Sequence, residues 1–144
     1  MASITVVARY PVGPALVWRE LRAIDRHVQW MSDAVAITFD SEQREGVGTS
    51  FRCTTKVGPF VTHDRMKITV WRENATMGVE HAGLIRGRGV FELRADGTET
   101  VVTWREDLYF PWWALGPLGA FVARPVLRAI WTRNLRTLGD VISQ

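Results

Sequence analysis

Residues 83–96 read GLIRGRGVFELRAD, and residues 97–110 read GTETVVTWREDLYF. Apolar and polar residues alternate in both stretches, as they do in β-strands with one buried face. The dipeptide Asp96-Gly97 lies at their junction, and Asp-Gly between alternating stretches is a strong signal for a tight turn. The sequence therefore predicts an antiparallel hairpin in this region.

Two glycines occupy the first predicted strand of this hairpin. If the Asp-Gly dipeptide forms the two-residue turn, Gly89 lies opposite Trp104. Gly87 then lies opposite Glu106. Glycine inside a strand weakens it and leaves space above the sheet. Because an indole and a carboxylate would line that space, the pattern predicts a ligand cavity above the hairpin.

Length and composition predict a single domain over residues 1–144. The chain has 47% hydrophobic and 23% charged residues, which is ordinary for a globular protein. Its net charge of +3 comes from scattered arginines, so the sequence argues against nucleic-acid binding. The uncharged segment over residues 110–123 contains two prolines and is too short to span a bilayer. With Cys53 as the only cysteine and no signal-peptide pattern at the start, we expect a cytoplasmic protein without stable membrane insertion.

Periodicity along the rest of the chain predicts an α+β domain. Strands are expected over residues 4–10, 35–39, 49–55, 61–71 and 77–81, followed by the two strands of the hairpin. A helix opened by Gly13-Pro14 and a short turn or helix near residues 27–31 follow the first strand. Apolar residues recur at helical spacing from Leu127 onward, so the last element is a long helix that Pro125 either starts or kinks.

The strand over residues 61–71 leaves two alternatives open. Met66, Ile68 and Val70 indicate one inward-facing side, and Trp71 with the long stems of Arg65 and Lys67 indicates the other. In either case the apolar face of the sheet must be covered, and only the terminal helix is long enough to cover it. We therefore expect a curved antiparallel sheet around that helix, with a cavity between them.

Motifs spread over the whole chain carry a family resemblance. They are Val17-Trp18 in the first helix, Asp25 and Trp30 after it, Gly46-Val-Gly48-Thr49, the Gly87-x-Gly89 strand and Val102-Thr-Trp-Arg-Glu106. Together they resemble the START and Bet v 1-like (SRPBCC) superfamily, and within it the bacterial polyketide cyclase/dehydrase and lipid-transport group. The resemblance implies a helix-grip fold: a curved seven-stranded antiparallel sheet wrapped around the C-terminal helix, two short helices after the first strand, and a deep hydrophobic cavity.

The resemblance also implies a class of ligand and a set of activities. Members of the superfamily bind lipids, sterols, hormones or aromatic polyketides, and some cyclise or dehydrate them. The leading hypothesis is a carrier or binding module for a hydrophobic, ring-containing small molecule. A polyketide aromatase/cyclase or dehydratase is the main alternative. A third alternative is a membrane-surface or protein-interaction module, with a homodimer among the partners considered.

Glu106 and His81 are the candidate catalytic residues. A carboxyl group on a cavity face suits a general acid or a hydrogen-bond donor to a ligand carbonyl, which is the role considered for Glu106. Alternatively, Glu106 lies at the rim and pairs with an arginine such as Arg124 or Arg128. His81 lies on an apolar strand face, where it acts as a base, a ligand donor or a structural residue. The predicted pairing places these two residues about 12 Å apart, too far to share a proton.

Eight residues are predicted to contact the ligand. They are Trp30, Phe51, Gly87, Gly89, Phe91, Trp104, Trp131 and Asn134. Trp30 and Trp104 offer flat walls for a ring system, although core packing is the other role open to Trp30. Asn134 lies on the apolar face of the last helix, so it needs a hydrogen-bonding partner. A ligand, Glu106 and a backbone carbonyl are the alternatives for that partner.

The sequence predicts no cofactor and no metal site. Cys53 has no cysteine or histidine at a metal-binding spacing. The paired glycines at 46 and 48, and at 87 and 89, lack the third glycine and the helix of a dinucleotide-binding loop. Residues 110–121, FPWWALGPLGAF, form an unusual aromatic segment. A cavity lid, a dimer contact, a membrane-touching patch and a loop packed over the sheet are the alternatives for it.

Overall fold

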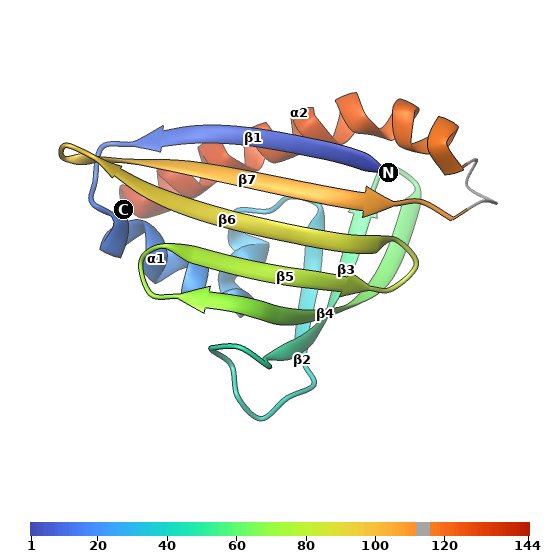
Figure 1. Cartoon of the computed structure of the whole chain (residues 1–144), viewed down its shortest axis with the longest axis horizontal. Helices are drawn as coiled ribbons and strands as arrows, with labels where there is room; N and C mark the ends of the chain where they lie inside the picture. The colour runs from blue at the N-terminus through green and yellow to red at the C-terminus, as the bar shows by residue number, and fades with distance from the viewer. Residues whose placement is uncertain (112–115) are drawn as a thin grey trace.

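The computed structural model describes residues 1–111 and 116–144, so Trp112 and Trp113 of the aromatic segment lie outside the described residues. The elements follow one another as β1 (Ala2–Tyr10), α1 (Pro14–Arg22), η1 (Ile24–Gln29), β2 (Ala34–Phe39), β3 (Ser50–Val57), β4 (Phe60–Arg72), β5 (Thr76–Ala82), β6 (Arg86–Asp96), β7 (Glu99–Tyr109) and α2 (Gly116–Ile142). Figure 1 shows the strands as one curved layer, with α1 and α2 behind it in this view.

The seven strands form one antiparallel sheet in the order β1-β7-β6-β5-β4-β3-β2. Strands β2 to β7 follow one another as a meander, and β1 closes onto β7 at the edge. Two short helices separate β1 from β2, and α2 follows the last strand. The predicted α+β architecture, with its seven strands, two short helices and long terminal helix, is confirmed.

The hairpin between β6 and β7 exists, but its turn differs from the prediction. Gly97 and Thr98 form the two-residue loop, and Asp96 pairs with Glu99. Gly97 has a φ of 61°, and a glycine with positive φ at the first loop position is typical of a type II′ turn. The register therefore moves by two residues relative to the prediction. A shift of two keeps every side chain on its predicted face but changes its partner.

This shift changes what lies beside the two glycines of β6. Gly89 lies opposite Glu106 rather than Trp104. Gly87 lies opposite Leu108 rather than Glu106. The predicted open space beneath the indole is therefore wrong, because the gap at Gly89 lies next to a carboxylate.

β4 carries an irregularity that resolves the two alternatives for residues 61–71. Its pairing with β5 shifts between Ile68 and Val70. Before the shift, Asp64, Met66 and Ile68 face inward, and after it Trp71 packs against the core. An extra residue in one strand reverses the alternation of its side chains. Each pattern is therefore correct for part of the strand only, and Val70, Arg65 and Lys67 are exposed.

α2 continues through Pro125, so the longer of the two predicted helices is the observed one. Its C-terminal half buries Trp131, Leu135 and Leu138. The hydroxyl of Tyr10 donates a hydrogen bond to the carbonyl of Leu135 at 2.6 Å. This contact fastens the helix to β1 at the edge of the sheet.

Candidate functional site

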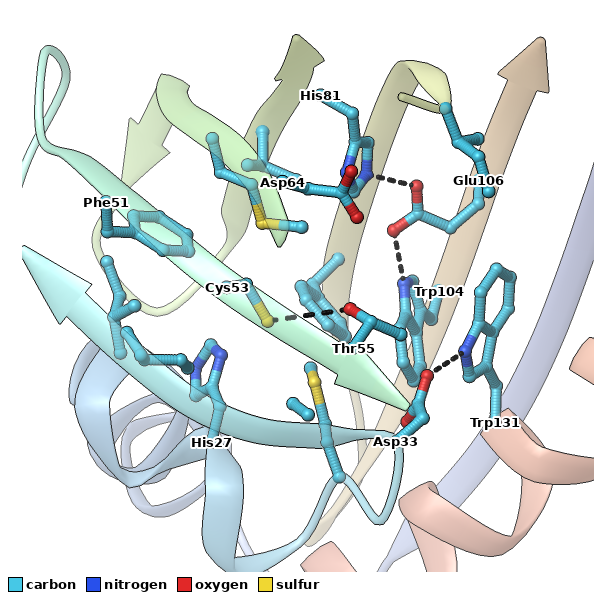
Figure 2. A pocket seen from close by; sticks show the side chains of 18 of the residues that line it. His27, Asp33, Phe51, Cys53, Thr55, Asp64, His81, Trp104, Glu106 and Trp131 are labelled. Atoms are coloured by element: carbon cyan, nitrogen blue, oxygen red, sulfur yellow. Dashed lines mark hydrogen bonds and ion pairs between the residues drawn. The ribbon is translucent and has the colours of Figure 1, made fainter. Parts of the chain in front are cut away.

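A pocket of about 140 Å³ lies between the sheet, η1 and α2 (Figure 2). Apolar side chains from β2 to β7 line most of it. Three ionisable side chains, His81, Glu106 and Asp64, lie close together on one side of it (Figure 2). The pocket thus combines an apolar body with a small polar end, which is typical of sites for small organic molecules.

Stacked aromatic side chains form one wall of the pocket. The rings of Trp104 and Trp131 stack with their centroids 5.0 Å apart and their planes at 24°. Phe91 adds a third ring, 4.8 Å from that of Trp104. Phe51 lines the pocket from β3. Four of the predicted ligand-binding residues therefore border the pocket, and together they suit a flat apolar ligand.

Trp30 lies behind this wall. It is 1% exposed, and its ring meets those of Phe91 and Trp104 edge-on at 6.1 and 6.2 Å. It supports the wall by core packing and does not itself line the pocket. Of its two predicted roles, the structure shows the packing role.

His81 and Glu106 form a hydrogen-bonded pair, so the prediction that they are too far apart to share a proton is wrong. His81 Nε2 lies 2.8 Å from Glu106 Oε2, and Trp104 Nε1 donates to Glu106 Oε1 at 3.1 Å (Figure 2). A carboxylate only accepts hydrogen bonds, so Nε2 of His81 carries the proton in this contact. Glu106 is 4% exposed, and its partners are an imidazole and an indole rather than Arg124 or Arg128.

The gap at Gly89 lets these two side chains meet across β6. His81 lies opposite Gly87, and Glu106 lies opposite Gly89, so the backbone offset between them along β6 is the predicted one. A Cβ atom on Gly89 would overlap the carboxyl group of Glu106. Without that atom, the side chains reach over β6 toward each other. The two side chains are long enough to span the separation between their backbone positions.

Gly87 is a glycine for a different reason. Its φ is 152°, which L-residues rarely adopt, and a Cβ there would overlap the backbone carbonyl of Asp107. Neither Gly87 nor Gly89 lines this pocket. Both glycines therefore act on the site by allowing close approach of neighbouring groups, which corrects their predicted role as ligand contacts.

The surroundings of His81 favour its protonated form. Burial works against the charged imidazolium, but the hydrogen bond to Glu106 and the negative charges of Glu106 and Asp64 outweigh burial. The pKa of His81 is therefore raised above its ordinary value. The His81–Glu106 pair is thus able to hold a proton near neutral pH inside an apolar pocket. This suits both acid–base chemistry and hydrogen bonding to a ligand.

Asp64 is a third ionisable group on the polar side of the pocket, and it was not predicted from the sequence. It is 6% exposed, and Figure 2 shows its carboxyl group beside His81. Thr62 Oγ1 donates to Asp64 Oδ2 at 3.0 Å, whereas Oδ1 has no hydrogen-bond partner among the described residues. The available signal was Met66, because a residue two positions before it shares its face of the strand.

A second carboxylate lies at the contact between α2 and the turn before β2. Asn134 Nδ2 donates to Asp33 Oδ1 at 2.7 Å, and Trp131 Nε1 donates to Asp33 Oδ2 at 3.1 Å. Asn134 Oδ1 accepts from the amide and the hydroxyl of Ser32, both at 3.0 Å. We call this group of four residues the Asp33 clasp. Asn134 is occupied within it and does not line the pocket, so its predicted ligand role and its three predicted partners are wrong.

Two further titratable groups, His27 and Cys53, line the pocket in neutral form. Burial lowers the pKa of His27 to about 4, and its Nε2 donates to the carbonyl of Leu21 at 2.8 Å. Burial raises the pKa of Cys53 to about 11, so the side chain is a thiol at neutral pH. Within the described residues, no three His, Cys, Asp or Glu side chains come together as metal ligands.

An exposed apolar surface lies on the N-terminal half of α2. Leu118, Phe121, Val122 and Val126 are exposed there, Phe121 to 73%. None of the helices in the described parts of the chain combines the length and the hydropathy that a membrane span requires.

Comparison with known protein families identifies the family of this chain. A family profile described as polyketide cyclase / dehydrase and lipid transport matches residues 1–142. Because the match spans nearly the whole sequence, the protein belongs to this family. No sequence among curated proteins matches significantly.

Solved structures share the architecture. TTHA0849 from Thermus thermophilus superposes with a TM-score of 0.74 at 12% identity, covering 97% of this chain and 93% of that one. Ara h 8.0201 gives 0.73 at 16% identity, with 99% and 98% covered. Zhui aromatase/cyclase from Streptomyces sp. R1128 gives 0.70 at 14% identity, with 97% and 90% covered. At these identities the likeness defines the fold alone, which is the helix-grip fold of the START and Bet v 1-like superfamily.

Proposed function

We propose that this chain binds a hydrophobic, ring-containing small molecule in the pocket between the sheet and α2. The stacked pair of Trp104 and Trp131 carries this proposal, because both indoles line the pocket and offer aromatic surface to a ring. The His81–Glu106 pair supplies a polar end that would orient the ligand. Family membership supports the proposal in kind, since the family's description includes lipid transport.

The volume of the pocket limits what it holds without movement. An apolar cavity of about 150 Å³ accepts a benzene ring. The pocket measures about 140 Å³, so a single ring is the part of the ligand proposed to fill it. A larger lipid-like or polyketide-like ligand would require the pocket to widen.

Tryptophan fluorescence during titration with 4-ethylphenol tests the proposal. Trp131 lines the pocket, whereas Trp18 is buried in the core and does not line it. We expect Trp131→Phe to weaken binding several-fold and Trp18→Phe, its matched control, to keep the affinity of the wild type. Equal losses in the two variants would contradict a site at the stacked wall. Native mass spectrometry of the purified protein would then identify any ligand that copurifies.

The His81–Glu106 pair favours a second candidate function, a polyketide aromatase/cyclase or dehydratase. Such reactions add a proton to an oxygen and remove one from carbon, and a buried imidazole with a raised pKa is suited to the first step. Glu106 would orient the ring and stabilise its positive charge. A protein of the same fold is named an aromatase/cyclase, which makes this candidate reasonable for the scaffold.

The exposed surface of α2 favours the third alternative, attachment to a membrane surface. Arg124 and Arg128 lie beside its apolar residues along the helix, and cations attract anionic lipid headgroups. Cosedimentation with anionic phospholipid vesicles is expected to decrease in Phe121→Ser. Val7→Ser, at an exposed apolar position on β1, is the control. A homodimer and a cytoplasmic location stay predictions from the sequence.

A further inference from the structure

The polar side of the pocket has an acceptor without a donor. Both oxygens of Glu106 are engaged, one by His81 and the other by Trp104. Asp64 accepts one bond at Oδ2 from Thr62, and its Oδ1 has no donor within the described residues. Asp64 is 6% exposed and lines the pocket. Oδ1 itself packs against Gly83, so a donor in the pocket reaches it only if the carboxyl group turns. Because buried polar atoms are almost always hydrogen-bonded, a molecule in the pocket is the expected source of the missing donor.

The charges on this side disfavour one class of ligand. As carboxylates, Asp64 and Glu106 contribute two negative charges, and His81 returns at most one positive charge. Among the described residues, no lysine or arginine lines the pocket. A carboxylate or phosphate on the ligand would therefore meet net repulsion, which is strong in surroundings of low dielectric constant. A neutral hydroxyl group would not.

We propose that the pocket selects ring-containing ligands that carry a hydrogen-bond donor, such as a phenolic hydroxyl, and rejects those that end in a carboxylate. The ring packs against Trp104 and Trp131, and the hydroxyl donates to the carboxylate of Asp64, which turns from Gly83 to meet it. This inference rests on the proposed ring-binding function and names the ligand class for the same pocket. Asp64 acts in it as the residue that determines specificity.

Three probes of similar size test the selection in the wild-type protein. They are 4-ethylphenol, its methyl ether 4-ethylanisole, and 4-ethylbenzoate, with affinities measured by isothermal titration calorimetry at pH 7.5. A hydrogen bond to a charged acceptor, and the cost of leaving that acceptor unpaired, favour the phenol. We expect it to bind about tenfold or more tightly than the ether, with the benzoate weakest.

Asp64→Asn then tests the assigned residue. The amide has nearly the same size but removes the negative charge, so the preference for phenol over ether is expected to shrink to about threefold or less, and the affinity for the benzoate to rise. Asp107→Asn makes the same chemical change at a β7 position whose side chain does not line this pocket, and it should leave the ranking unchanged. A ranking that changes equally in both variants would overturn the assignment to Asp64.

The outcomes separate the two proposals. Equal affinity of the wild type for all three probes overturns the selection while leaving ring binding intact. Failure of all three probes to bind overturns the proposed function itself. Because the ranking is first measured on the wild type, poor folding of Asp64→Asn does not remove the test.

Discussion

Glu106 and Asp33 both line the pocket, and each accepts an indole N–H at 3.1 Å from one member of the stacked tryptophan pair. The third partner differs, since His81 completes one group and Asn134 the other. An imidazole gains and loses a proton near neutral pH, whereas an amide does not. The same carboxylate–indole unit is therefore able to take part in acid–base chemistry at one end of the pocket and only to hold the chain together at the other.

The positions of the two groups in the fold agree with this division. The Asp33 clasp joins α2 to the turn before β2, so it connects elements that share no backbone hydrogen bonds of a sheet or helix. The His81–Glu106 pair lies between strands that β6 already holds in register. We therefore expect the fold to depend on the clasp more than on the pair, so that substitutions at the two ends separate stability from ligand binding.

Asn134→Leu is expected to have the largest effect on stability. Leucine suits the apolar face of α2, but it leaves Asp33 Oδ1 without this donor and the amide of Ser32 without its acceptor. Hydrogen bonds to charged groups contribute about 1.5–3 kcal/mol, so we expect the free energy of unfolding to fall by about 2–3 kcal/mol. Urea denaturation measures it. Unchanged or higher stability would show that the clasp is dispensable and would return Asn134 to the ligand-binding set.

Gly89→Ala should have the next largest effect, at the other end of the pocket. Its Cβ would overlap the carboxyl group of Glu106 and push it away from His81. We expect a loss of about 1–2 kcal/mol in stability, because a buried hydrogen bond is broken. The pKa of His81, followed by NMR titration of its ring protons, should fall as the stabilising partner moves away.

A double variant identifies the cause of that loss. In a Glu106→Ala background the carboxyl group above Gly89 is gone, so the alanine there should cost less than about 0.5 kcal/mol. An equal cost in both backgrounds would mean that Gly89 permits a bend of the sheet instead. The glycine would then have no particular relation to the His81–Glu106 pair.

The fold was predictable because alternation and helical spacing report which face of each element is buried. That information placed Glu106, His81 and Trp104 on the inner face, and the structure confirms all three. It does not report the reach of side chains. The contact between His81 and Glu106 depends on two long side chains meeting over Gly89, which backbone spacing alone could not indicate.

Two other parts of the site could not be predicted from alternation and helical spacing, each for a different reason. Asp64 was hidden by the irregularity between Ile68 and Val70, which makes β4 carry two opposite alternations. The partners of Asn134 lie in a turn about 100 residues away in the sequence, and a turn has no periodicity that points to a helix. Asn134 itself was visible as a polar residue on an apolar face, but the identity of its partner required the tertiary structure.

The pH dependence of stability should also distinguish the two ends, with a smaller effect than either substitution. His81 has a raised pKa in the folded protein, so its protonation stabilises the fold fully below the unfolded value of about 6.5. That contribution is lost as the pH rises through the raised value. The loss is partial, because a neutral His81 still donates from Nε2 to Glu106. The groups that face the ring are Glu106 and Asp64.

Urea denaturation between pH 6.5 and 8.5 measures this decline. The quantity followed is the difference in the free energy of unfolding between the wild type and His81→Gln. His27 acts in the opposite direction, because a folded pKa of about 4 makes stability rise as the unfolded state loses its proton near pH 6.5. That rise is common to both proteins and cancels in the difference. We expect the difference to decline with pH, and to decline equally in an Asn134→Leu background. A difference that stays constant with pH would mean that the protonation of His81 does not affect stability. The chemical distinction between the His81–Glu106 pair and the Asp33 clasp would then be lost.

Glu106→Gln should have the smallest effect on binding, and it separates a carrier from an enzyme. Glutamine keeps the shape of the side chain: its carbonyl still accepts from Trp104, and its amide donates to a neutral His81. The affinity for 4-ethylphenol, measured by calorimetry, should therefore stay within about 1 kcal/mol of the wild type. If the His81–Glu106 pair transfers protons, turnover of a polyketide-like substrate should instead fall about a hundredfold or more while binding survives, because the imidazole loses the charge that raises its pKa. A large loss of affinity would instead mean that Glu106 contacts the ligand directly and that its bonds to His81 and Trp104 give way on binding.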